Sequence, residues 1–233
     1  MIARDQPTIF PPEVVVRVSS VEDGTMSLRS LPEDPGEVWQ NRKEFINMCG
    51  GDLDRTALVY ITYEASRTYE EYARAETIKP GLVAYDDGIA DGLLATSDIG
   101  LFLPVADCCA VVMYDTARRV MMMSHIGRQS IEVDGVRKSL DFMRAQANTA
   151  PHDIVSWLGP AVGKTNYPIY RRENRGLREL IVSDLEDAGV SARNIEVSPA
   201  VTDQNPDYFS HSEYKKSRRT SDGRFAVFAM MQK

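Results

Sequence analysis

The chain has 233 residues, of which 43% are hydrophobic, so it can bury a substantial core. This composition excludes a disordered or fibrous protein. Lysine and arginine total 27 against 34 aspartate and glutamate residues, which gives a net charge of -7. Such a chain has no basic field to attract nucleic acid or anionic lipid, so we expect a small-molecule or protein partner.

The sequence shows no signal for export or membrane insertion. The first residues, MIARDQPTIFPPE, lack the basic lead and apolar core of a secretory signal. The most apolar stretch, 101–114, contains Pro104 and Asp107, which a membrane helix would not accept. Three cysteines, two of them adjacent, make a poor disulfide framework and suit a reducing compartment. We therefore expect a cytoplasmic protein that is a monomer or a small homo-oligomer.

Strands alternate with one clear helix in the N-terminal part of the chain. The expected elements, in chain order, are a strand at 13–18, a turn at 22–24, a helix at 35–49 and a strand at 56–63. Asp34 can cap the helix, Pro35 suits its first turn, and Gly50 ends it. The polar segment 66–76 is compatible with a helix or an irregular excursion.

A sheet-rich centre follows, and helices return after it. We expect strands at 93–96, 101–105, 110–115 and 120–125, a helix at 133–143, a strand at 154–158, a helix at 177–185, and strands at 194–197 and 224–231. The last segment, RFAVFAMM, is almost wholly apolar, which is typical of a strand buried on both faces. No repeat or linker divides the chain, so we expect one domain over residues 1–233.

Three familiar site types are excluded by residue spacing or number. The segment GPAVGKT ends like a phosphate loop, but Leu158 stands where the loop's first glycine belongs. The His-x-Glu and Pro-Cys-x-x-Cys signature of zinc deaminases is absent. The whole chain has only three histidines, too few for a multicopper oxidase, which needs a His-His-Cys copper and a histidine-rich cluster besides.

Cys108 and His125 are the most informative pair of residues. Each lies at the end of an expected strand, and those strands can be hairpin neighbours. A thiolate and an imidazole at one sheet edge suit a zinc ion, or a Cys-His nucleophile pair. The alternative is a buried thiol beside a hydrogen-bonded core histidine. Asp107 favours a functional site, because an acid after a buried apolar run must be paired or functional.

Several segments in order resemble the YfiH-like family, long labelled polyphenol oxidase or laccase-domain proteins and associated with purine nucleoside metabolism. The stretch ADGLLATSDIGLFLPVADCCAVVMYD, followed by VMMMSHIGRQS, is similar to the family's centre. The segments DPGEVWQNRKEFINMCG, WLGPAVG, DYFSH and GRFAVFAM are similar to its early helix, Gly-Pro loop, C-terminal segment and final strand. The resemblance covers nearly the whole chain.

This resemblance implies an α+β fold, a layered α/β/β/α sandwich with mixed sheets. It also implies one metal ion, usually zinc, held by one cysteine and two histidines. Cys108 matches the ligand cysteine and His125 the second ligand histidine. Where the family has its first histidine, this chain reads Tyr60-Ile61-Thr62-Tyr63-Glu64, so Tyr63 or a near neighbour takes that place. Glu64 and His211 are further candidates for the third ligand.

The resemblance also indicates residues for substrate. Arg17, Asn41, Arg42, Arg128 and His211 are candidate contacts to the phosphate or hydroxyl groups of a nucleoside. For Asn41 and Arg42 a salt bridge on the helix surface is an equal alternative. The family's Trp-Arg after its His-x-Gly is Arg128-Gln129 here, and its arginine-rich run after Phe-Ser is Ser212-Glu213.

Three functions follow from these residues. The first is a zinc-dependent enzyme that cleaves adenosine-like nucleosides with phosphate and also deaminates adenosine. In it Cys108 and His125 hold the metal, and Asp107 orients a neighbour or moves a proton. The second is a non-catalytic relative that binds a small ligand or partner. The third is a thiol hydrolase built on Cys108 and His125, with no metal requirement.

Overall fold

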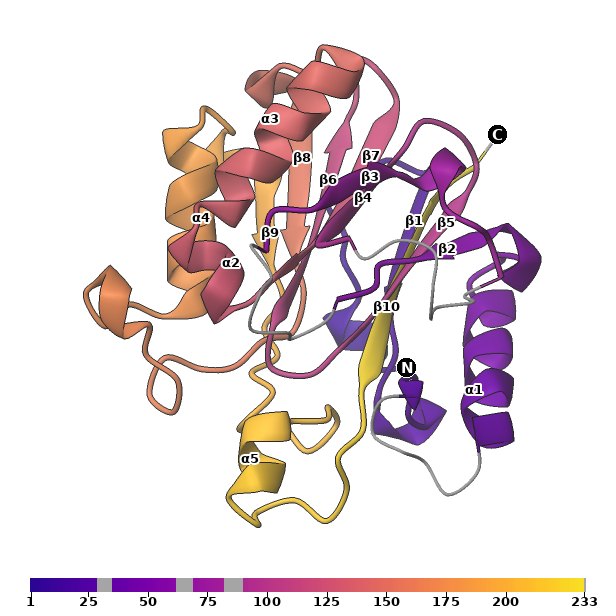
Figure 1. Cartoon of the computed structure of the whole chain (residues 1–233), viewed down its shortest axis with the longest axis vertical. Coiled ribbons are helices and arrows are strands. Elements are labelled where there is room, and N and C mark those ends of the chain that lie inside the picture. Colours follow the sequence, from indigo (N-terminus) through magenta and orange to yellow (C-terminus); the bar gives the residue numbers. More distant parts are fainter. Residues whose placement is uncertain (29–34, 62–68, 82–89, 233) are drawn as a thin grey trace.

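The computed structural model describes residues 1–28, 35–61, 69–81 and 90–232. It is an α+β structure in which two mixed sheets lie between helices (Figure 1). The smaller sheet has the strand order β1-β10-β5-β2. Its strands are β1 (Val14–Val18), β2 (Thr56–Leu58), β5 (Gly100–Val105) and β10 (Phe225–Met231). Strands β2 and β5 run parallel, whereas β10 is antiparallel to both of its neighbours.

The larger sheet has six strands in the order β3-β4-β7-β6-β8-β9. These strands are β3 (Tyr72–Arg74), β4 (Gly92–Ala95), β6 (Cys109–Asp115), β7 (Val120–Ile126), β8 (Ile154–Leu158) and β9 (Ile195–Val197). Strands β6 and β7 form the central hairpin and are buried along their whole length. This hairpin carries the two residues singled out as a thiol and imidazole pair.

Helices cover the outer faces of the two sheets. They are α1 (Pro35–Met48), α2 (Arg128–Glu132), α3 (Gly135–Ala147) and α4 (Leu177–Asp187), whereas α5 (His211–Lys215) lies at one end of the sheets (Figure 1). Helix α1 packs on the smaller sheet through Phe45 and Ile46, which contact Phe102 and Phe228. Helices α2, α3 and α4 pack on the larger sheet, as Figure 1 shows. No helix in the described part of the chain is long and apolar enough to cross a membrane.

The largest core lies between the sheets, where residues such as Val16, Leu101, Val112 and Val227 pack together. Alternate residues of the buried strands point to opposite sides, so each central strand contributes to two apolar layers. Two helical layers outside two sheets make the α/β/β/α sandwich. The expected fold class is therefore confirmed.

The central strands and the later helices agree with the sequence predictions. The last strand is buried on both faces, as its apolar composition indicates. Antiparallel pairing of β6 and β7 places Ala110 opposite His125, which brings Cys108 to the same end of the hairpin. Helix α1 begins at Pro35, and Gly50 follows its end in the left-handed region at φ 78°. Asp34, the expected cap, lies outside the described residues.

Two predictions of local structure were wrong. Residues 72–74, expected as helix or irregular chain, form β3, which extends the larger sheet by pairing parallel to β4. This short edge strand is polar and only half-buried, so its hydrophobic pattern is too weak to indicate a strand. The strand expected over 56–63 ends at Leu58, and residues 62–63 lie outside the described ranges.

Candidate functional site

A pocket of about 700 Å³ opens where the two sheets and the C-terminal segment meet. Its walls come from the ends of β2, β5 and β7, the start of α2, the loop 162–167 and helix α5. Parallel β2 and β5 end on the side where β7 also ends and β6 and β10 begin. Chain segments far apart in sequence therefore meet at one end of both sheets.

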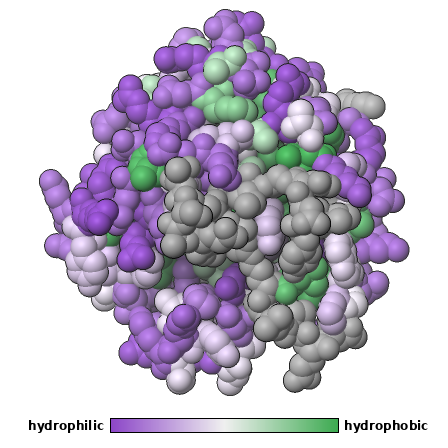
Figure 2. All heavy atoms as spheres, in the orientation of Figure 1, coloured by the Kyte–Doolittle hydropathy of each residue, from purple (hydrophilic) through white to green (hydrophobic). Residues whose placement is uncertain are grey.

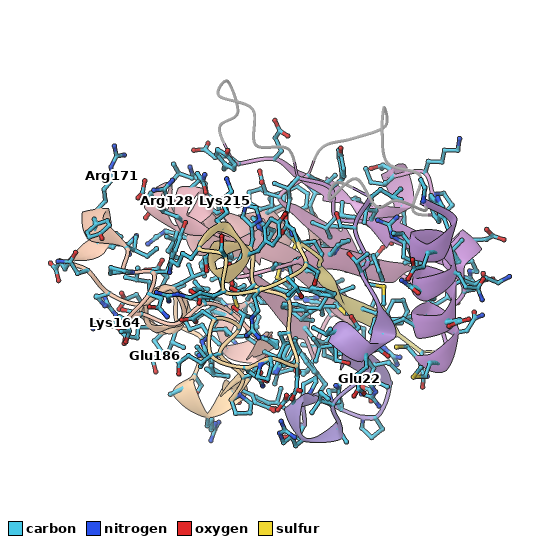
Figure 3. The ribbon with its side chains drawn as sticks, turned by 90° about the horizontal axis from the view of Figure 1, so that it is seen from below. Glu22, Arg128, Lys164, Arg171, Glu186 and Lys215 are labelled. Atoms are coloured by element: carbon cyan, nitrogen blue, oxygen red, sulfur yellow. The ribbon has the colours of Figure 1, made fainter. Side chains whose placement is uncertain are left out.

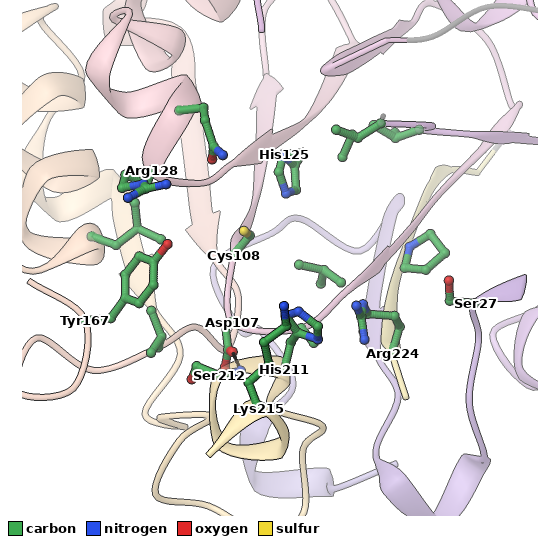
Figure 4. A pocket seen from close by; sticks show the side chains of 18 of the residues that line it. Ser27, Asp107, Cys108, His125, Arg128, Tyr167, His211, Ser212, Lys215 and Arg224 are labelled. Carbon is green, nitrogen blue, oxygen red and sulfur yellow. Dashed lines mark hydrogen bonds between the residues drawn. The ribbon is translucent and has the colours of Figure 1, made fainter. Parts of the chain in front are cut away.

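Cys108 and His125 lie together in this pocket (Figure 4). Cys108 precedes the first residue of β6, and His125 is the sixth residue of β7, with its backbone N–H donating to Asp91 O at 2.8 Å. A Cβ added at Gly127 would lie 2.8 Å from Cys108 Sγ and 3.4 Å from His125 Cε1. The two side chains therefore both reach the space beside Gly127, where an added Cβ would displace the Cys108 thiol.

Asp107 is a buried structural anchor for the neighbouring segments. Its backbone adopts the left-handed region at φ 73°, which aspartate tolerates better than most residues. One carboxylate oxygen accepts from Thr202 Oγ1 at 2.7 Å, and the other from the Ser212 backbone N–H at 2.6 Å. Its own carbonyl accepts from Val162 N–H. The carboxylate is thus paired, and it orients neighbours rather than facing a ligand unpaired.

The first turn of α5 places His211 in the pocket wall. Ser210 caps this turn, its Oγ accepting from the Glu213 backbone N–H. His211 Nδ1 lies 2.8 Å from Asp222 Oδ1, and Arg224 donates to the same oxygen at 2.6 Å. Figure 4 shows His211 and Arg224 near each other, with Cys108 and His125 farther up the pocket. The sequence indicates His211 as a candidate, but no local pattern in it indicates the pairing with Asp222.

Positive charge dominates the pocket lining although the chain is acidic. Five arginine and lysine residues line it, namely Arg42, Arg128, Lys215, Lys216 and Arg224. Figure 4 shows Arg128 beside Tyr167 and Lys215 on α5, and Figure 3 shows Arg171 pointing outward at the periphery. Neither Arg128 nor Lys215 forms an ion pair with a carboxylate in the described part of the chain. In Figure 2 most of the coloured surface is hydrophilic, and this colouring does not separate basic from acidic side chains. Unpaired cations in a concave site attract anionic ligands.

The structure separates the candidate substrate residues into two groups. Arg42, Arg128 and His211 line the pocket. Arg17 does not, because it lies in β1 and its Nη1 donates to Val16 O at 2.8 Å. Asn41 is also outside the lining, and its amide donates to Thr25 O at 3.1 Å. Arg17 and Asn41 thus lie outside the lining and contact backbone carbonyl groups.

Arg42 is more deeply buried than a helix-surface residue. Its side chain is 3% exposed, and its Nε donates to Met26 O at 2.8 Å. The guanidinium also lies over the rings of Trp39 and Phe102, at 5.1 and 5.7 Å from their centroids. Arg42 therefore connects α1 to the smaller sheet at the pocket wall. This buried position differs from the salt bridge on the helix surface that was the alternative expected from the sequence.

The third metal ligand expected from the resemblance has no counterpart in the described residues. Tyr63 and Glu64 lie outside them. Within the ranges that the structure describes, no three His, Cys, Asp or Glu side chains gather closely enough to hold a metal ion. Cys108, His125 and His211 therefore line one pocket without forming a compact three-ligand cluster.

The three cysteines differ strongly in accessibility, which gives a first prediction. Cys49 and Cys109 are 7% and 0% exposed, and burial raises the pKa of each thiol to about 12. Cys108 is half-buried and faces the pocket. Because thiolates react and buried thiols do not, we expect iodoacetamide at neutral pH to modify Cys108 alone. Peptide mass spectrometry checks this, and modification of Cys49 or Cys109 in folded protein would contradict it.

The pocket also contains residues that sequence reasoning missed. Tyr167 follows the Gly-Pro loop, and Lys215 and Arg224 come from the C-terminal segment. Burial raises the pKa of the Tyr167 hydroxyl, and the nearby Cys108 acts in the same direction. Arg224 could have been noted from its place directly before an apolar strand. Lys215 carries no comparable signal, because a lysine pair on a polar helix is typical of a solvated surface.

Comparisons with known proteins place the chain in a family. A family model described as "Multi-copper polyphenol oxidoreductase laccase" matches residues 20–176, more than half of the chain. No match was found among curated proteins. Bacillus licheniformis hypothetical protein YfiH superposes with a TM-score of 0.81 and 20% identity, covering 94% of this chain and 93% of that one.

Two further solved structures have the same fold. YlmD from Geobacillus stearothermophilus gives a TM-score of 0.82 at 19% identity, covering 100% of this chain and 98% of its own. A Neisseria meningitidis protein assigned to the DUF152 family gives 0.74 at 15% identity, with 98% of each chain covered. At such low identities these structural similarities show the fold alone. The assignment of the chain to a family rests on the match to the family model. The chain belongs to the YfiH-like family, whose model bears the name multi-copper polyphenol oxidoreductase laccase.

Proposed function

We propose that this pocket binds a purine nucleoside together with phosphate and cleaves the nucleoside by phosphorolysis. One observation carries the proposal: a thiol and imidazole pair shares a single pocket with two cations that no described carboxylate neutralises. The resemblance supplies the substrate class, and the pocket supplies groups that suit it. A volume of about 700 Å³ is within the range of small-molecule sites and has room for a nucleoside and phosphate.

The donor set fits zinc better than copper. A multicopper site needs more histidines than this chain has, and His152, one of its three, is exposed on a surface turn away from the pocket. Cys108 and His125 converge as a thiolate and imidazole pair, which are ligands zinc prefers. In this site Cys108 and His125 would hold the ion. When bound, zinc lowers the pKa of its water to about 7, which is the chemistry that deamination needs.

The pocket's own residues supply the binding that phosphorolysis requires. Arg128 and Lys215 give phosphate a cationic cradle, since both face the pocket without a carboxylate partner among the described residues. Tyr60 and Tyr167 provide aromatic surface in the lining for a planar base. Asp107 keeps helix α5, and with it Lys215, at a fixed place beside Cys108. Positioning phosphate and nucleoside together is a large part of catalysis in such a reaction.

The test is to incubate purified, zinc-supplemented protein with adenosine, with and without phosphate, and to separate the products by chromatography. We expect adenine and ribose 1-phosphate only when phosphate is present, because phosphate is the nucleophile. Inosine formed without phosphate would support the additional deamination. Inosine and guanosine are tested in the same way to define the base preference.

The alternatives give different outcomes in the same assay. The absence of a close group of three His, Cys, Asp or Glu side chains among the described residues favours a non-catalytic relative. That relative would bind nucleoside without product from adenosine, inosine or guanosine, and this result would overturn phosphorolysis. A thiol hydrolase built on Cys108 and His125 would keep full activity after chelation and lose it on alkylation.

A further inference from the structure

His211 and Asp222 form a carboxylate–imidazole pair in the pocket wall. His211 Nδ1 lies 2.8 Å from Asp222 Oδ1. Partial burial opposes the charge on Asp222, but hydrogen bonds from His211 and Arg224 hold the pKa of its carboxyl below the usual value. A carboxylate can only accept, so Nδ1 carries the hydrogen of this bond. Nε2 is therefore the nitrogen that His211 offers to the pocket (Figure 4).

Neighbouring contacts fix this pair with respect to Cys108. Asp107, the residue before Cys108, accepts from the Ser212 backbone N–H at 2.6 Å, so the residue after His211 is tied to the residue before Cys108. Arg224 holds Asp222 from the other side through a 2.6 Å bond. The imidazole is thus oriented by Asp222 and placed by Asp107, as a group that exchanges protons must be.

Other lining groups are less suited to proton exchange. Arginine side chains in the lining, such as Arg128 and Arg224, are hydrogen-bond donors with no acceptor atom. Both carboxylate oxygens of Asp107 already accept hydrogen bonds. Burial raises the pKa of Tyr167, which hinders its ionisation. The His211 imidazole has a ring nitrogen, Nε2, that can both donate and accept a hydrogen, and Asp222 holds the ring through Nδ1.

We propose that His211, oriented by Asp222, donates the proton that the purine needs as it leaves the ribose; this inference rests on the proposed phosphorolysis. A phosphate oxygen forms a bond to the ribose C1′ while the bond from C1′ to the base nitrogen breaks. The electron pair of that bond goes to the base, which receives the Nε2 proton of His211. Hydrogen phosphate has lost its proton on becoming ribose 1-phosphate, and that proton returns His211 to its charged form. Asp222 acts through His211 and is a positioning residue.

The experiment measures phosphorolysis and bound zinc for His211→Ala and Asp222→Asn. General acid catalysis contributes about 10²- to 10⁴-fold, so we expect His211→Ala to lower kcat by at least about a hundredfold. Added imidazole should restore part of that turnover, because the truncated side chain leaves room for it in the open pocket. Asp222→Asn should lower kcat about tenfold with KM nearly unchanged, the effect of weakening one charge-assisted hydrogen bond. Its amide oxygen still accepts from Arg224.

His152→Ala is the matched control. His152 also lies near an aspartate, at 3.6 Å from Asp153, but it is exposed outside the pocket, so kcat should not change. Zinc content should be the same in all variants. Turnover of His211→Ala equal to that of the control, zinc lost from His211→Ala, or no rescue by imidazole would overturn the inference while phosphorolysis stands. No turnover by the unaltered protein would overturn both proposals.

Discussion

Replacement of Cys108 by serine is expected to remove most bound zinc and to lower kcat/KM by more than about a hundredfold. Removal of a residue that hydrogen-bonds to a metal ligand lowers metal affinity or activity by about 10- to 100-fold. Removal of the ligand itself should therefore lower both by more. A serine hydroxyl does not ionise near neutral pH and cannot replace the thiolate. The side chain is smaller and faces the pocket, so the fold should be unaffected. Metal analysis, phosphorolysis and thermal unfolding measure the three effects.

The adjacent cysteine provides the matched control. Cys109 is fully buried in the apolar layer between the larger sheet and its helices, whereas Cys108 faces the pocket. Cys109→Ser should lower the free energy of unfolding by about 1–3 kcal/mol, because a hydroxyl enters an apolar layer. It should leave zinc content and kcat unchanged. If Cys108→Ser kept zinc and full turnover, Cys108 would not be a ligand.

The sequence predicts most of the fold because the central strands carry strong local signals. Strands β5, β6 and β7 are nearly continuous apolar runs between short polar turns, which is typical of buried strands. In the structure nearly every residue of these strands is buried. Strand β3 lacks such a signal. It forms because β4 offers a free edge, and a single sequence does not show that edge.

The site is only partly visible in the sequence for a similar reason. Cys108 and His125 could be paired because neighbouring strands of one hairpin bring them together. Lys215 and Arg224 enter the same pocket from a segment about a hundred residues away, and no local pattern encodes that approach. The Asp107 carboxylate holds this C-terminal segment in place by accepting hydrogen bonds from Thr202 and Ser212. In the sequence these two partners are ordinary polar residues with nothing to mark them.

Asp107→Ala should cause the largest loss of stability at this site, about 3–7 kcal/mol in the free energy of unfolding. The change removes the acceptor for two donors, Thr202 Oγ1 and Ser212 N–H, and each buried unsatisfied donor costs about 1–3 kcal/mol. Alanine also tolerates the left-handed backbone at φ 73° less well than aspartate, which adds about 1 kcal/mol. Chemical denaturation measures the loss.

Asp107→Asn separates the hydrogen bonds from the backbone effect. Asparagine accepts the left-handed conformation, and its oxygen can still accept from Ser212 N–H. The amide is neutral, however, and its NH2 would have to donate to Thr202 Oγ1. The charge-assisted bonds are therefore lost, and we expect a loss of about 1–3 kcal/mol. Asp141→Ala, on the exposed face of α3, should change stability by less than about 0.5 kcal/mol. Both Asp107 variants should also lower kcat, because α5 carries His211 and Lys215 and loses its tie to the residue before Cys108. Stability losses equal to that of Asp141→Ala would show that Asp107 does not anchor this helix.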